Sequence, residues 1–282
     1  MKEKPVFKSE QGRDRILTRY RSLIERLPVP YRERAVPTSF GGTYVLEAGG
    51  EELPPVLLLH GSCSNSAMWI GDIGPLSAAH RVLCVDIVGE AGNSAPNRPA
   101  LSGDGYARWL GEVLDGLGIP KTDLIGNSLG GWIALQFAAL YPDRIAHMVL
   151  IAPSGIVPTR PSYLLRLLFH AAQGKKGMAA LARLMYGSDD VPEEVVEVST
   201  MIMDNYNPIV GALPVLSDER MGRLAMPVLY IVGADDVTAD TGKAAERLRR
   251  LVPKAQIERI PNHGHVVFDT MDRVVPFLAE KG

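Results

Sequence analysis

The sequence is poor in the features that mark secreted and membrane proteins. Only Cys63 and Cys84 are present among 282 residues, too few for a disulfide framework, so both are expected to be reduced thiols. The first residues are charged and lack the apolar core of about 7 to 15 residues that a secretory signal requires. No run approaches the roughly 18 consecutive apolar residues of a membrane span. These absences favour a cytoplasmic location and argue against a membrane partner.

An excess of one charge is also lacking. The chain has 30 Lys and Arg against 32 Asp and Glu, which gives a formal net charge of -2. A protein that neutralises phosphates needs a basic surface, so no nucleic-acid partner is expected. His80, His147 and His170 lie far apart and have no ligand spacing. The sequence therefore predicts neither a metal site nor a cofactor.

What is present is a regular alternation of short apolar runs with helical patterns, typical of parallel strands buried under crossover helices. The predicted strands are 55–60, 81–88, 123–127, 147–152, 228–233 and 257–261, and the predicted helices are 66–78, 104–117, 129–141, 240–252 and 270–280. Upstream, a helix is predicted over 12–27, followed by an antiparallel hairpin of strands 31–38 and 43–47. The sequence therefore predicts an α/β fold with a mostly parallel, eight-stranded sheet flanked by helices.

The alternation breaks once, between Pro153 and Met226. This stretch has helical patterns at 163–169 and 195–203, turns that contain Gly and Pro, and no convincing parallel strand. We therefore expect a helical lid inserted into the sheet domain. The predicted division is core 1–155, lid 156–222 and a second part of the core at 223–282.

The strongest chemical signal is the turn Gly126-Asn127-Ser128-Leu129-Gly130. A serine hydroxyl is a poor nucleophile unless a base lies beside it and its oxygen stands clear of the backbone. A Gly-x-Ser-x-Gly turn between a strand and a helix supplies that position, and here an apolar strand precedes the turn and a helical pattern follows it. The simpler alternative is that Ser128 only caps the helix. The context favours Ser128 as a nucleophile.

With this turn, further motifs make the chain resemble the α/β-hydrolase family over nearly its whole length. His60-Gly61-Ser62 looks like the oxyanion loop of that family, and 86–94 looks like the loop after its next strand. Ser128 is followed by Gly-Ala-Asp-Asp at 233–236 and Asn-His-Gly-His at 262–265. That chain order of serine, acid and histidine is the order that this fold uses. The resemblance implies the α/β-hydrolase fold.

A narrower resemblance rests on five short segments. They are similar to bacterial carboxylesterases of the naproxen-esterase type, and they lie at 37–41, 68–69, 85–89, 109–110 and 152–154. This resemblance implies hydrolysis of a carboxylic ester.

Two histidines and two aspartates compete for the roles of base and acid. The resemblance selects His265, which follows a glycine after the last strand, over His263. It selects Asp236, three residues after the glycine that ends a strand, over Asp235. The expected role of Asp236 is to accept a hydrogen bond from His265 and stabilise its cation. The predicted catalytic set is therefore Ser128, Asp236 and His265.

The developing oxyanion requires two backbone N–H donors. The fold implies Leu129, directly after the nucleophile, as the first donor, and Ser62 in the His60-Gly61 loop as the second. A helix-capping role near residue 240 is expected for Asp240 or Asp235.

Four further residues could suggest chemistry, but we expect structural roles for them. His60 is expected to brace its loop by hydrogen bonding, and Cys63 to pack as a small apolar group. Asp86 and Glu90 form a possible carboxylate pair, but the family resemblance implies that their loop shapes the floor of the site.

The predicted lid carries many apolar side chains, which suggest an apolar roof over the substrate. They are Leu164, Leu167, Leu168, Phe169, Met178, Leu181, Leu184, Met185, Met201 and Met203, and most of them could instead only pack the lid on the sheet. We therefore expect a serine hydrolase that cleaves a small, apolar carboxylic ester through an acyl-enzyme. The oligomeric state stays open.

Two alternatives also stay open. The first is a carbon-carbon hydrolase of the meta-cleavage-product type, whose nucleophile turn resembles Gly126-Asn127-Ser128, although this chain has Val266 where that group carries tryptophan. The second is a receptor-like protein that binds a small ligand with little turnover.

Overall fold

A computed structural model describes residues 4–187, 191–209 and 211–280. One eight-stranded sheet forms its centre, with the strand order β1-β2-β4-β3-β5-β6-β7-β8. The strands are β1 (Tyr31–Thr38), β2 (Gly41–Ala48), β3 (Pro55–Leu59), β4 (Arg81–Val85), β5 (Thr122–Asn127), β6 (Ile145–Ile151), β7 (Val228–Gly233) and β8 (Gln256–Ile260). β2 runs antiparallel to its neighbours β1 and β4, and the six strands β3 to β8 are parallel to one another. The predicted fold class is confirmed.

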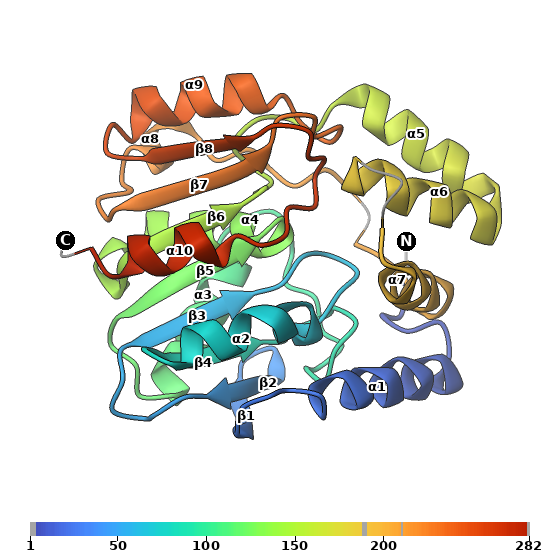
Figure 1. The fold of residues 1–282 in the computed structure, drawn as a ribbon, viewed down its shortest axis with the longest axis horizontal. Coiled ribbons are helices and arrows are strands. Elements are labelled where there is room, and N and C mark those ends of the chain that lie inside the picture. The colour runs from blue at the N-terminus through green and yellow to red at the C-terminus, as the bar shows by residue number, and fades with distance from the viewer. Residues whose placement is uncertain (1–3, 188–190, 210, 281–282) are drawn as a thin grey trace.

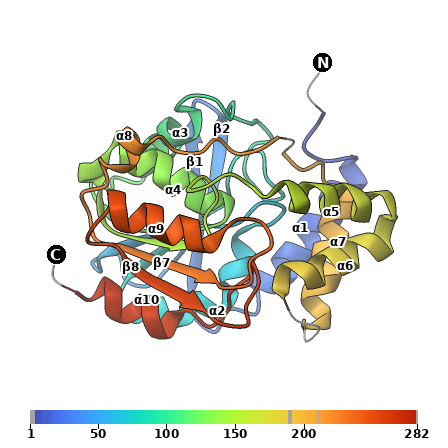
Figure 2. The same ribbon diagram turned by 90° about the horizontal axis from the view of Figure 1, so that it is seen from above.

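Helices cover both faces of the sheet (Figures 1 and 2). α2 (Ile70–Ser77) and α10 (Met271–Leu278) pack on one face, together with the end of α1 (Glu10–Ile24). α3 (Gly105–Gly116), α4 (Leu129–Leu140), α8 (Asp218–Met221) and α9 (Thr241–Leu251) pack on the other. Strands such as β3 are wholly apolar because both of their faces are buried. No helix among the described residues is long and apolar enough to cross a membrane.

Strand β4 ends at Val85, three residues before the predicted end. Asp86 begins the loop after the strand, and its buried carboxylate binds backbone amides of the turn at 66–69 and of its own loop. It accepts hydrogen bonds from the backbone N–H of Ser66 at 2.9 Å and of Asn93 at 2.8 Å. A side chain that holds loops together in this way cannot be recognised from the apolar pattern alone.

The chain between β6 and β7 contains α5 (Pro161–Ala172), α6 (Gly174–Tyr186) and α7 (Glu193–Asn205). These helices and α1 lie together at one end of the sheet, the end toward which β7 and β8 point (Figures 1 and 2). Ile156 and Leu216, at the two ends of this insertion, are buried in the main core.

The apolar side chains of the insertion do not all face inward. Leu168 and Phe169 on α5 are 68% and 64% exposed, so they face solvent rather than roof a pocket. Leu181 on α6 is buried, and Met201 lines a shallow hollow of about 370 Å³ beside α1 and α7. The side chain of Met178 lies outside those that the structure describes.

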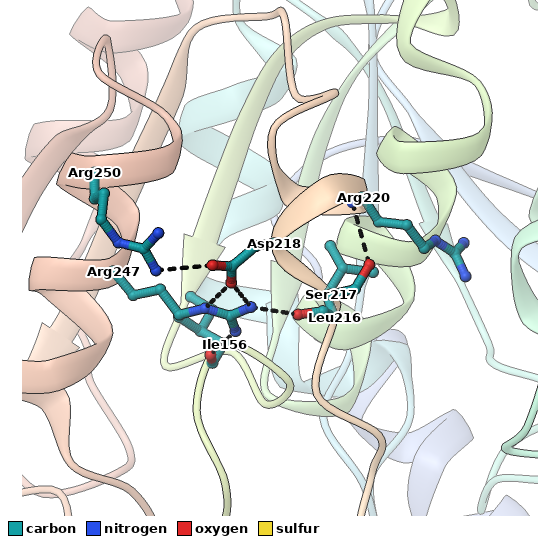
Figure 3. A network of polar contacts seen from close by, with 7 residues as sticks. All are labelled: Ile156, Leu216, Ser217, Asp218, Arg220, Arg247 and Arg250. Atoms are coloured by element: carbon teal, nitrogen blue, oxygen red, sulfur yellow. Dashed lines mark hydrogen bonds and ion pairs between the residues drawn. The ribbon is translucent and has the colours of Figure 1, made fainter.

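One arginine holds both ends of the insertion (Figure 3). Arg247, on α9, donates to the carbonyl oxygens of Ile156 and Leu216, the latter at 2.6 Å, and its Nε lies 3.0 Å from an Asp218 carboxylate oxygen. The Leu216 N–H also donates to the Gly155 carbonyl at 2.9 Å. The entry and exit of the insertion are thus fastened to each other and to α9.

We expect Arg247→Ala to lower the free energy of unfolding by about 2 kcal/mol, because it leaves two backbone carbonyls without their charged donor and leaves Asp218 with Arg250 alone. Arg250→Ala is the matched control, since Arg250 contacts the other oxygen of Asp218 from a side chain that is 62% exposed, against 16% for Arg247. Its expected effect is under about 0.5 kcal/mol. Urea unfolding of both variants measures the difference, and equal losses would contradict the specific role of Arg247.

Candidate active site

Ser128 occupies a sharp corner between β5 and α4. Its backbone φ is 49° and its ψ is -105°, a conformation that costs a non-glycine residue about 1 to 3 kcal/mol. The corner is fixed because the Ser128 N–H donates to the Ile151 carbonyl at 3.0 Å and its carbonyl accepts from Ser154 N–H at 3.1 Å. The strain is therefore maintained by the surrounding sheet.

The glycines on either side of Ser128 are required by close packing. A Cβ atom on Gly126 would lie 2.6 Å from the Gly130 carbonyl oxygen, and one on Gly130 would lie 2.2 Å from the Leu59 carbonyl oxygen. Strand, turn and helix could not approach one another this closely with any larger residue.

The structure brings the three predicted catalytic side chains into one hydrogen-bonded series. His265 Nε2 lies 3.0 Å from Ser128 Oγ, and His265 Nδ1 lies 2.8 Å from Asp236 Oδ2. The three residues follow β5, β8 and β7, whose carboxyl ends lie at the same edge of the sheet. Both His265 and Asp236 are buried.

The Asp236 carboxyl is held in its ionised form. Burial is the largest influence and by itself would raise its pKa, but the charge of His265 and hydrogen bonds from His265 and Thr238 bring the pKa below its usual value. Thr238 donates its N–H to Asp236 Oδ1 at 2.7 Å, and its hydroxyl lies 3.2 Å from His265 Nδ1. The sequence reasoning missed Thr238, although its place two residues after the acid is a signal that could have been used.

The two competing residues, Asp235 and His263, lie outside this hydrogen-bonded series. Asp235 is exposed, and His263 Nδ1 lies 2.9 Å from the Pro261 carbonyl oxygen. Asp240 caps α9 by accepting from Lys243 N–H at 3.1 Å, which confirms the capping alternative for that residue.

The amides around the nucleophile are not equally available. As the first residue of α4, Leu129 has a backbone N–H outside the helical ladder. The next amide, that of Gly130, is engaged because it donates to the His60 carbonyl at 3.1 Å. This bond also ties the turn to the loop after β3.

In that loop the amides on both sides of Ser62 are engaged. Gly61 N–H donates to the Met68 sulfur at 3.3 Å, and Cys63 N–H donates to Glu90 Oε2 at 2.7 Å. Within the described residues, the Ser62 N–H donates no hydrogen bond to another protein atom. It is therefore the available amide donor of the loop.

His60 braces the loop, as expected. Ile87 N–H donates to His60 Nε2 at 2.9 Å, so the ring proton is on Nδ1, which lies 2.7 Å from the Gly61 carbonyl oxygen. Burial lowers the pKa of His60 and keeps the ring neutral. Burial and the Glu90 carboxylate raise the pKa of the Cys63 thiol to about 12, which makes it a poor nucleophile.

The inserted helices contact this site directly. Gly264 N–H donates to the Tyr186 carbonyl at 3.1 Å and Val266 N–H to the Met185 carbonyl at 3.0 Å, so the end of α6 holds the backbone on both sides of His265. Tyr163, on α5, lies near enough to Cys63 and Asp236 that both add to the effect of burial in raising its pKa to about 12.

A second cluster lies away from this site. His147 Nδ1 is 2.9 Å from Asp123 and His80 Nε2 is 4.0 Å from the other oxygen of the same carboxylate. Both histidines are buried at the opposite end of the sheet, a proximity that their distance in sequence concealed. The described residues contain no group of three or more His, Cys, Asp or Glu side chains that could hold a metal ion.

An eight-stranded sheet with a serine turn, an acid and a histidine in this order is the architecture of the α/β-hydrolases, and residues 54–193 match that fold family. The chain belongs to the α/β-hydrolase fold family. It is 30% identical to the uncharacterized carboxylesterase nap of Bacillus subtilis strain 168, over 88% of this chain and 85% of that protein. It is 28% identical to carboxylesterase YbfK of the same organism, over 85% and 83% of the two chains.

Similarity to solved structures supports the same relationship. The crystal structure of naproxen esterase from Bacillus subtilis superposes with a TM-score of 0.83 at 28% identity, and the match covers 95% of this chain and 96% of that one. The resemblance to bacterial carboxylesterases of the naproxen-esterase type is therefore confirmed.

Proposed function

We propose that this protein is a carboxylic ester hydrolase that works through a Ser128 acyl-enzyme. The observation that carries the proposal is the continuous series from Ser128 Oγ through His265 to Asp236, with separations of 3.0 and 2.8 Å. The similarity to two curated carboxylesterases supports the same reaction class.

In the proposed reaction, His265 Nε2 accepts the Ser128 hydroxyl proton while Oγ attacks the ester carbonyl carbon. The carbonyl oxygen becomes an oxyanion that the N–H groups of Ser62 and Leu129 stabilise. Asp236, which stays ionised, stabilises the His265 cation. His265 then gives its proton to the leaving alcohol as the C–O bond breaks, and Ser128 keeps the acyl group.

Water completes the cycle. His265 accepts a proton from the water that attacks the acyl carbon. As the second tetrahedral intermediate collapses, the bond from the acyl carbon to Ser128 Oγ breaks, His265 returns the proton to Oγ, and the acid is released. No cofactor or metal takes part in these steps.

The substrate that we propose is a small, apolar ester. The insertion supports this class because α5 and α6 reach the site through Tyr163 and the loop of His265. We expect this contact to reduce the access of water, which favours an apolar ester. We assign the lid function to residues 156–222, with the understanding that the exposed face of α5 does not contribute to the roof.

A side-by-side assay tests the reaction class. The purified chain is given p-nitrophenyl esters of increasing acyl length and, separately, a dienoic ketone acid whose cleavage breaks a carbon-carbon bond. We expect multiple turnovers of the esters and none of the ketone acid. Faster cleavage of the ketone acid would establish the carbon-carbon hydrolase instead, and ligand binding without repeated turnover of any ester would indicate a receptor.

A further inference from the structure

Glu90 is a buried carboxylate that the proposed reaction does not use. Glu90 is only 1% exposed and lies in the loop that follows β4. Oε2 accepts the Cys63 N–H at 2.7 Å, and Oε1 accepts the Tyr206 hydroxyl at 2.7 Å. One carboxylate therefore joins the loop after β3 to the residue that ends α7.

The bond to Cys63 has a direct consequence for Ser62. Cys63 has a backbone φ of 56°, which a residue with a Cβ rarely adopts. The Cys63 N–H points at Glu90, and this hydrogen bond holds the plane of the peptide group that directly follows Ser62. Without the acceptor, a buried N–H would be left unsatisfied and the left-handed conformation would lose its support.

The surroundings indicate that acceptor geometry, rather than charge, is what Glu90 contributes. Burial raises the pKa of Glu90 to about 7, even though bonds from Tyr206 and Cys63 and the charge of Arg98 act in the other direction. Arg98 does not form an ion pair with Glu90 within the described residues; its guanidinium lies over the Tyr206 ring at 5.4 Å and donates to the carbonyls of Gly89 and Asn207. The groups that act on the Glu90 carboxyl are thus those of Cys63, Tyr206 and Arg98.

We propose that Glu90 is a positioning residue for the oxyanion hole: by accepting the Cys63 N–H, it orients the loop so that the Ser62 amide faces the reacting carbonyl. This inference rests on the proposed function. Glu90 acts through the loop and touches no reacting atom. Its bond to Tyr206 attaches α7 to the same carboxylate and contributes to stability.

Three variants separate these roles. Glu90→Ala removes the acceptor, and we expect kcat for a p-nitrophenyl ester to fall by about 10- to 100-fold with KM within about 3-fold, because a misaligned oxyanion donor affects the transition state more than the bound ester. Glu90→Gln keeps an oxygen for Cys63 and can donate its amide to Tyr206, so it should stay within about 3-fold of the wild-type kcat. Tyr206→Phe removes the hydroxyl that donates to Glu90 and, at 3.5 Å, to the Gly89 carbonyl, and it leaves the Cys63 bond in place. Its melting temperature should fall while kcat stays near the wild-type value.

A second readout distinguishes positioning from a general loss of structure. A trifluoromethyl ketone forms a tetrahedral adduct with the serine, and its oxygen occupies the oxyanion hole. We expect its inhibition constant to rise in Glu90→Ala by about the same factor as kcat/KM falls, and to be unchanged in Glu90→Gln. Unchanged inhibition and kcat in Glu90→Ala, or equal losses of kcat in Glu90→Ala and Tyr206→Phe, would overturn the inference.

The assignment of Ser128 is tested separately, so the two failures can be told apart. If Ser128→Ala is inactive while Glu90→Ala retains full activity, only the role of Glu90 is wrong. If Ser128→Ala retains activity, the proposed function itself is wrong.

Discussion

Ser128→Ala is expected to lower kcat for a chromogenic ester by about 10⁶-fold, because removing a triad nucleophile leaves only the contribution of the oxyanion hole and of binding. Alanine also has a Cβ, so it meets the same backbone strain at φ 49° as the serine that it replaces. The melting temperature should therefore change little. Steady-state rates with a carefully purified variant measure the loss.

The matched control for this variant is Ser22→Ala. Ser22 lies on α1, and its hydroxyl bonds only to Arg19 of the same helix in the described structure. We expect activity within about 2-fold of the wild type, as for most surface changes. Substantial ester turnover by Ser128→Ala would mean that another group is the nucleophile.

Asp236→Asn is expected to lower kcat by about 10⁴-fold, because an amide can hold His265 in the wrong tautomer and cannot stabilise its cation. Asp235→Asn is the matched control one residue away, and it should retain activity because Asp235 is exposed and the series runs through Asp236. The ratio of kcat/KM between the two variants is the measurement. If Asp235→Asn were the more damaged variant, the assignment of the acid would be reversed.

The same residue gives a stability prediction with a definite sign. The folded pKa of Asp236 lies below its usual value, so the carboxylate stabilises the fold above the unfolded pKa, about 3.9, and this contribution is lost as the pH falls through the folded value. Urea unfolding should therefore show a larger gap between the wild type and Asp236→Asn at pH 7 than at pH 3. A gap that widens toward low pH would contradict the direction of the shift.

The strands and the serine turn could be predicted from sequence because their signals are local. An apolar run such as 55–59 is buried on both faces, and the glycines beside Ser128 are needed by contacts within a few residues along the motif or with the adjacent strand. The choices of His265 and Asp236 depended on family spacing, since His263 and Asp235 carry the same chemistry close by.

What the sequence could not predict depends on long-range packing. Glu90 meets Tyr206 across a separation of 116 residues, and His147 meets Asp123 across 24. The periodicity of apolar residues along the chain does not predict such pairs. The orientation of α5 was hidden for a related reason: its apolar residues would fit a roof over the site equally well, yet Leu168 and Phe169 face solvent.

Labelling with a fluorophosphonate tests the central claim most directly, because the reagent modifies a serine only where a base activates it. After digestion, mass spectrometry should find one phosphonylated residue per chain, Ser128, in step with the loss of ester turnover, and no label on Ser128→Ala. Modification at any other residue, or an ester-cleaving enzyme whose Ser128 stays unlabelled, would contradict the assignment of Ser128 as the nucleophile.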